Sequence, residues 1–155
     1  MFVRAASGRQ RFDVLGAWNG VTRQFLAVTN TTAVNTGTMV ELLRVIAAEG
    51  LVGPITVVLD NAKHQRNKVV QAEAAGLGIG LLYLPRYSPN LNLIERLWGF
   101  AKRQSVYGKD RANFASFRAA IEATLAGVHS THAAELASLM TLRFRTFDDV
   151  SLLAA

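Results

Sequence analysis

The sequence predicts an α/β domain in which a mixed sheet is flanked by helices. Two alternating runs around Asn19-Gly20 indicate a hairpin, and a strand, a helix and a second strand follow between Ile55 and Leu84. Amphipathic helical patterns come after them. With 155 residues, half of them apolar, the chain can bury one hydrophobic core. We therefore expect residues 1–155 to form a single domain without repeats or linkers.

The first predicted element is an antiparallel hairpin. The alternating runs Arg11 to Trp18 and Thr22 to Thr29 flank Asn19-Gly20. Both turn residues tolerate the positive φ of a type I′ turn, and Asn-Gly is the strongest short-range signal for one. The sequence thus predicts two strands joined by a two-residue turn.

A helix is predicted next. The run Thr38 to Glu41 has the spacing of a capping box, and Gly50 can end the helix. Between them apolar residues recur at helical spacing, which predicts one buried face. That face consists of Met39, Leu42, Leu43, Ile46 and Ala47.

A strand, a helix and a strand form the centre of the chain. The apolar run Ile55 to Leu59 is continuous, as is typical of a strand covered on both faces. Gln65 to Ala75 favours a helix closed by Gly76 and Gly78, and Ile79 to Leu84 is interpreted as a second buried strand. Strands joined in this way run parallel, so we expect a crossover unit.

Three further helices are predicted. The first runs from Leu93 to Gln104 with Asn92 as its cap, the second is capped by Asp110 and ends at Gly127, and the third covers Thr131 to Leu142. The expected buried positions are Ile94, Leu97, Trp98 and Ala101 in the first helix and Phe114, Phe117, Ile121 and Leu125 in the second.

Composition narrows the classes of function. The net charge of +6 favours a polyanionic partner, because the release of phosphate counterions drives basic surfaces onto nucleic acid. Between Lys63 and Arg111 nine basic residues stand against three acidic ones, although a solvated helix face explains such an excess as well. No stretch approaches the ~18 apolar residues of a membrane span, and no apolar core follows the first residues. We expect a cytoplasmic, nucleoid-associated protein without a membrane partner.

Two acidic residues, Asp60 and Glu95, are the candidate metal ligands. Asp60 directly follows a predicted parallel strand, where α/β folds place ligand-binding side chains, and Glu95 begins a helix with thirty-four residues between the two. The sequence has no cysteine, so carboxylates and histidines are its plausible metal ligands. Each residue also has a structural alternative, since Asp60 can form a turn and Glu95 can complete a capping box with Asn92.

Asp60 lies in the segment Val58 to Ala62, and Glu95 lies in the segment Leu82 to Trp98. Both segments resemble the catalytic domain of DDE transposases of bacterial insertion sequences, in the mariner-like superfamily. The resemblance implies a ribonuclease H-like fold and covers nearly the whole chain. The helix-turn-helix modules with which such transposases bind the ends of their element are expected to be absent. The similar segments are Val58 to Ala62 and Leu82 to Trp98, with Ser7 to Phe12, Val14 to Ala17, Thr29 to Thr32 and Leu142 to Phe144 around them.

The resemblance also implies a metal-dependent mechanism. In that family three carboxylates hold two Mg²⁺ or Mn²⁺ ions for in-line attack on a phosphodiester. Asp60 matches the second carboxylate and Glu95 the third, whereas no acidic residue precedes Asp13 to supply the first. The family's first strand, central in its sheet, is likewise expected to be missing. These departures predict a chain that is truncated at its N-terminus and inactive alone.

The implied partner is double-stranded DNA, both the element ends and the target. A second copy of the chain or an intact transposase is a further expected partner. Near the carboxylates, cationic side chains are candidates for phosphate contacts, with simple solvation as the alternative. The candidates are Lys63, Arg66, Lys68, Lys102 and Arg103.

Three functions remain open at this point. The first is a fragment of a transposase catalytic domain, for DNA cleavage and strand transfer. The second is a non-catalytic remnant that binds DNA or oligomerises and modulates an intact transposase. The third is a different ribonuclease H-like nuclease that uses Asp13 as its first metal ligand.

Overall fold

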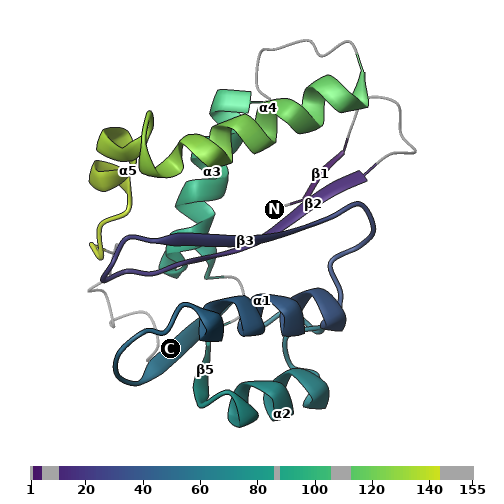
Figure 1. The fold of residues 1–155 in the computed structure, drawn as a ribbon, viewed down its shortest axis with the longest axis vertical. Coiled ribbons are helices and arrows are strands. Elements are labelled where there is room, and N and C mark those ends of the chain that lie inside the picture. The colour runs from purple at the N-terminus through teal and green to yellow at the C-terminus, as the bar shows by residue number, and fades with distance from the viewer. Residues whose placement is uncertain (1, 5–10, 86–87, 106–112, 144–155) are drawn as a thin grey trace, which may run out of the picture.

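A three-stranded sheet lies between two groups of helices in the computed structural model, which describes residues 2–4, 11–85, 88–105 and 113–143. Helices α3, α4 and α5 lie on one side of this sheet and α1 lies on the other, with β5 and α2 beyond α1 (Figure 1). The predicted α/β class is confirmed. The elements are β1 (Phe2–Arg4), β2 (Arg11–Trp18), β3 (Phe25–Asn30), α1 (Thr36–Ala48), β4 (Ile55–Leu59), α2 (Lys68–Gly76), β5 (Ile79–Tyr83), η1 (Pro89–Leu91), α3 (Leu93–Ser105), α4 (Phe114–Ala126), η2 (Gly127–His129) and α5 (Ala133–Leu139).

The predicted hairpin forms, but its turn is not of type I′. Strands β2 and β3 pair antiparallel with Trp18 opposite Phe25, so the loop comprises residues 19–24. The Asn19 side chain accepts hydrogen bonds from the amides of Val21 (2.9 Å) and Thr22 (3.0 Å). The positive φ of the loop, 62°, is at Arg23 instead of at Asn19-Gly20. The prediction of a two-residue turn was wrong, because the Asn19 side chain accepts hydrogen bonds that stabilise a longer loop.

The strands form two separate sheets. Strand β1 pairs antiparallel with β2, which makes β2 the middle strand of the order β1-β2-β3. Strands β4 and β5 pair only with each other, in parallel, with Val57 opposite Leu81. Among the described residues no strand joins the two sheets, so one edge of β4 is unpaired. A short strand, β1, already pairs with the edge of β2, so the expectation of a missing central strand stays a prediction.

The pleat of the hairpin β2–β3 separates two hydrophobic cores. Phe12 and Val14 pack among α3, α4 and α5, whereas Leu15 and Ala17 pack on the side of α1. The second core also takes in residues of β4 and β5. Because successive residues of a strand point to opposite faces, one hairpin holds both layers of helices.

Strands β4 and β5 are covered on one face only, contrary to the prediction. Val58 and Leu82 are opposite each other in the register and are 41% and 54% exposed. Leu59 and Ile79, in contrast, are 5% and 4% exposed and belong to the core with α1 and α2. A continuous apolar run therefore did not mean burial on both faces.

Side-chain caps shift the beginnings of two helices. Helix α1 begins at Thr36 because Asn35 and Thr38 form its capping box, so the predicted box at Thr38 to Glu41 was wrong. Helix α2 begins at Lys68, after Asn67 accepts a bond from Val69, and thus starts three residues later than predicted.

Helices α4 and α5 are shorter than predicted. Helix α4 is capped by Asn113 and Ser116, and the predicted cap Asp110 lies outside the described residues. A 3₁₀ turn, η2, follows α4, and α5 then ends at Leu139 instead of Leu142. Within the described ranges no helix has the length and apolar character needed to cross a membrane.

Two glycine substitutions, one in β2 and one in α3, are expected to change the stability of the fold in opposite directions. A Cβ atom at Gly16 would lie 2.6 Å from Phe25 Cε2 and 2.8 Å from a ring carbon of Trp98, so Gly16→Ala should destabilise the fold by about 1–3 kcal/mol. Gly99 lies inside α3 with nothing within 4 Å of its Cβ position, so Gly99→Ala should stabilise it by about 0.5–1 kcal/mol. Urea unfolding of both variants measures these effects, and a stable Gly16→Ala would contradict the packing.

Candidate functional site

The two candidate carboxylates lie at the end of a strand and the start of a helix. The amide of Leu84 donates to Leu59 O (2.8 Å), which continues the β4–β5 pairing up to Asp60. Asp60 is exposed at the carboxyl end of β4. Glu95 is exposed in the first turn of α3. Both residues therefore present oxygens to solvent from ordered elements.

Asn92 connects the two elements. Its Nδ2 donates to Asp60 Oδ1 at 2.5 Å, across thirty-two positions of sequence. Its Oδ1 accepts from the amide of Ile94 (3.4 Å), and its backbone oxygen accepts from the amide of Glu95 (3.2 Å). Asn92 thus caps α3, as predicted, and also holds the Asp60 carboxylate at the helix start.

The charge of Asp60 reaches Glu95. Partial burial, first, and the negative charge of Asp60, second, raise the pKa of Glu95 above its ordinary value of 4.5, and Lys102 acts in the opposite direction. Two carboxylates that repel each other favour a cation between them. In the capping-box alternative the Glu95 carboxylate accepts from the Asn92 amide, but among the described hydrogen bonds these residues are joined through their backbones.

The residue after Asp60 has an unusual conformation. Asn61 has φ +74°, in the left-handed region, and its Oδ1 is buried without a hydrogen-bond partner. This conformation is uncommon in non-glycine residues, although asparagine adopts it more readily than most. The residue that follows Asp60 therefore carries a buried oxygen acceptor without a hydrogen-bond partner.

The turn that follows is firmly held. Gln65 is 6% exposed, its Oε1 accepts from the amide of Ala62 (2.9 Å), and its backbone oxygen accepts from the Tyr83 hydroxyl (3.1 Å). The Arg66 guanidinium lies over the Tyr83 ring, 5.4 Å from its centroid. Three of the predicted phosphate-binding side chains are exposed on or beside this turn, namely Lys63, Arg66 and Lys68.

The other two predicted cations lie in the last part of α3. Lys102 is half-buried and electrostatically coupled to Glu95, whereas Arg103 is exposed. Trp98, on the same helix, is 5% exposed and packs edge-on against Phe25 at 5.8 Å between ring centroids. This packing confirms the prediction that Trp98 is a buried position of the helix.

Sequence reasoning missed the structural role of Arg96. Its guanidinium donates to the backbone oxygens of Leu139 (3.2 Å), Thr141 (2.6 Å) and Arg143 (2.8 Å). It thus anchors the chain after α5 to the helix that carries Glu95. The acceptors are backbone atoms more than forty positions away, so no local pattern could have indicated them.

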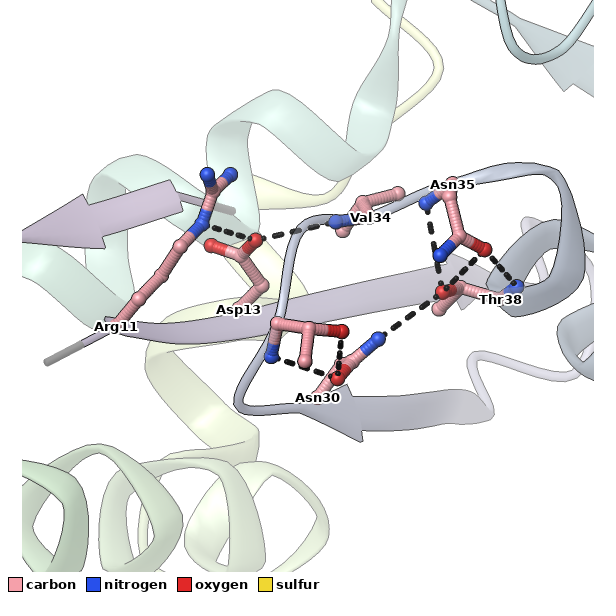
Figure 2. Close-up of polar contacts among 7 residues, drawn as sticks. Arg11, Asp13, Asn30, Val34, Asn35 and Thr38 are labelled. Carbon is pink, nitrogen blue, oxygen red and sulfur yellow. Dashed lines mark hydrogen bonds and ion pairs between the residues drawn. The ribbon is translucent and has the colours of Figure 1, made fainter.

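Asp13 is separate from the other two carboxylates. Its side chain is fully buried, and Oδ2 accepts from Arg11 Nε (2.7 Å) and from the amide of Val34 (3.2 Å), as Figure 2 shows. Next to it, Asn30 Nδ2 donates to Thr38 at the start of α1. This network ties β2 and β3 to the start of α1, which favours a structural role for Asp13.

The donor atoms of the site suit a hard divalent cation. Asp60 and Glu95 supply carboxylate oxygens, the preferred ligands of Mg²⁺, and the unpaired Oδ1 of Asn61 is a third oxygen acceptor nearby in sequence. The described ranges contain no group of three or more His, Cys, Asp or Glu residues able to hold a metal. Asp13 therefore does not complete a set with Asp60 and Glu95, and the nuclease hypothesis that needed it is not supported.

Comparison with known proteins agrees with this fold. Residues 3–118 match the family model described as DDE superfamily endonuclease. A chain of the cryo-EM structure of the simian T-cell lymphotropic virus intasome in complex with PP2A regulatory subunit B56 gamma has a TM-score of 0.56 and 16% identity, over 78% of this chain and 44% of that chain. This chain therefore spans less than half of that protein, and the likeness shows a ribonuclease H-like fold. No curated protein matches the sequence.

The raised pKa of Glu95 predicts a pH-dependent effect of Glu95→Gln. Folding favours protonated Glu95, so its contribution to stability is present below about pH 4.5 and is lost as the pH rises through the higher folded pKa. Without divalent cations, the melting temperature of Glu95→Gln relative to the wild type should therefore increase between pH 4 and pH 7, by about 1–2 °C because solvent screens the exposed group.

A matched control is available in α4. Glu122 pairs with Arg118 at 2.7 Å in an i,i+4 arrangement and is exposed, so Glu122→Gln should give no such gain. Scanning calorimetry at several pH values measures both variants. A relative melting temperature of Glu95→Gln that falls with rising pH would contradict the repulsion between Glu95 and Asp60.

Proposed function

The chain belongs to the DDE superfamily of endonucleases, and on that premise we propose that it is a catalytic domain of an insertion-sequence transposase, for cleavage and strand transfer of DNA. The observation that carries this proposal is the contact of Asn92 with Asp60, which brings the end of β4 to the start of α3. Asp60 and Glu95, far apart in sequence, thereby act on each other electrostatically. Juxtaposed carboxylates beside exposed cations suit phosphoryl transfer.

In this function Asp60 and Glu95 would hold Mg²⁺ or Mn²⁺, as a pair of ions in the complete site. The bound ions would activate the attacking oxygen and stabilise the leaving oxygen of the phosphodiester. The Asn92 side chain donates a hydrogen bond to Asp60, and Lys102 offsets the negative charge at Glu95. Lys63, Arg66 and Lys68 would contact the phosphates of double-stranded DNA, while Arg103 extends the basic surface along α3.

A third carboxylate is needed for the full set of ligands. We propose that a strand beside the unpaired edge of β4 brings it, either from outside the described residues or from a partner such as a second copy or an intact transposase. The support for this is that β4 pairs only with β5 in the described part of the chain. Residues 1–155 alone would then bind metal and DNA without cleaving it.

Metal binding tests the leading function. Addition of Mn²⁺ should broaden the NMR amide signals near Asp60 and Glu95, and Asp60→Asn should weaken binding by at least about 10-fold, because it removes a charged ligand. Glu73→Gln is the matched control, since Glu73 pairs with Arg44 away from the site. Broadening that persists unchanged in Asp60→Asn, or none in the wild type, would contradict a metal site here.

The second candidate function is a non-catalytic DNA-binding remnant, favoured by the basic side chains exposed around the turn after Asp60. It predicts DNA binding without a metal site, so the Mn²⁺ experiment separates it from the transposase hypothesis. Both candidate functions require that the basic side chains around this turn contact DNA phosphates.

The DNA contacts predict a salt dependence. If Lys63, Arg66 and Lys68 each neutralise one phosphate, the combined alanine variant should lower the slope of log K against log[salt] by about 2.7. Fluorescence anisotropy with a DNA duplex measures this slope. Arg44→Ala, at an exposed position on α1, is the control and should leave it unchanged. An unchanged slope in the triple variant would place the DNA elsewhere.

A further inference from the structure

We propose that Asn92 is a positioning residue that sets the orientation of the Asp60 carboxylate relative to Glu95. This proposal rests on the proposed metal-dependent function and names a further residue of the same site. It concerns the side-chain amide of Asn92, both ends of which have defined partners.

The orientation of that amide follows from its partners. An ionised carboxylate only accepts hydrogen bonds, so the NH₂ group must face Asp60 Oδ1 at 2.5 Å. The amide of Ile94 only donates, so it must face Asn92 Oδ1, at 3.4 Å. Asn92 is 8% exposed, which leaves little room for another arrangement. One side chain therefore joins the helix cap to the carboxylate.

This contact matters because Asp60 is otherwise exposed. An exposed carboxylate samples several rotamers, and a hydrogen bond to one oxygen restricts them. The bond engages Oδ1 and leaves Oδ2 for a cation. The backbone amide of Glu95 donates to the backbone oxygen of Asn92 at 3.2 Å, so Glu95 lies in the helical turn that Asn92 begins. Asn92 thus relates the two proposed ligands to each other, as outer residues of metal sites commonly do.

The alternative is that Asn92 serves only as a helix cap. Capping uses Oδ1 alone, and Ser or Asp supply an equivalent acceptor at such positions. The cap therefore does not require Nδ2, the atom that contacts Asp60. Substitutions that keep the acceptor and remove the donor separate the two roles.

Asn92→Ser provides this separation. Serine keeps a capping oxygen but is too short to donate to Asp60, so helix content by circular dichroism and the melting temperature without metal should stay close to the wild type. The dissociation constant for Mn²⁺, measured by electron paramagnetic resonance, should rise about 10-fold. Unchanged Mn²⁺ affinity in a folded Asn92→Ser protein would overturn the proposal.

Asn92→Asp tests the same contact by replacing the favourable interaction with Asp60 by a repulsive one. Aspartate keeps the cap but replaces the donor by a carboxylate oxygen facing Asp60, so the two groups repel unless a cation lies between them. The melting temperature should fall without metal, and the increase caused by Mn²⁺ should exceed that of the wild type. If Mn²⁺ raised the melting temperatures of Asn92→Asp and the wild type equally, Asn92 would not lie beside the bound cation.

A metal-free measurement distinguishes this inference from the proposed function. The side-chain NH₂ of Asn92 should give a downfield-shifted proton signal in ¹H–¹⁵N spectra, and Asp60→Ala should remove the shift. If the shift is lost in Asp60→Ala but no Mn²⁺ binds the wild type, the proposed function fails while the positioning contact stands. If Asp60→Ala leaves the Asn92 signal unchanged, the positioning role itself is wrong.

Discussion

Side chains that alternate along the hairpin β2–β3 hold both layers of helices in place. Phe12 and Val14 bury one layer of helices, and Leu15 and Ala17 bury the other. Glu95 belongs to the first layer through Leu97 and its neighbours on α3, whereas Asp60 belongs to the second through Leu59. The candidate site therefore lies where two separately packed layers meet, and Asn92 joins them there through Asp60.

Three energetically unfavourable features lie at or beside the candidate site. Asp60 raises the pKa of Glu95, Asn61 adopts a left-handed backbone, and the Asn61 Oδ1 is buried without a partner. Each feature opposes folding, whereas elsewhere the caps of α1 and α4 are fully bonded. Similar features also occur away from the site: Asp13 Oδ1 and Trp18 Nε1 are buried without a partner, and Arg23 has a φ of 62°. They therefore support a functional site only together with the contact between Asn92 and Asp60.

The basic surface around the site has a structural basis as well. Gln65 and Tyr83 hold the turn after Asp60, so Lys63 and Arg66 are presented from a fixed backbone. Other basic residues have structural partners instead: Arg96 binds the chain after α5, and Arg11 binds the buried Asp13. Net charge alone does not separate these two kinds of cation, because their difference lies in what each side chain contacts.

Local sequence patterns were enough to locate several elements, namely strand Arg11–Trp18, strand Ile55–Leu59, helix α3 with Asn92 as its cap, and Gly78 just after the end of α2. The sequence also indicated Asp60 and Glu95, because their places at a strand end and a helix start are read from local pattern. Other features became visible in the packed fold alone: the loop after Trp18, the exposed face with Val58 and Leu82, the roles of Arg96 and Asp13, and the contact of Asn92 with Asp60. The reason is physical: periodicity and capping act over a few residues, whereas burial and side-chain partners depend on segments that meet only when the chain has packed.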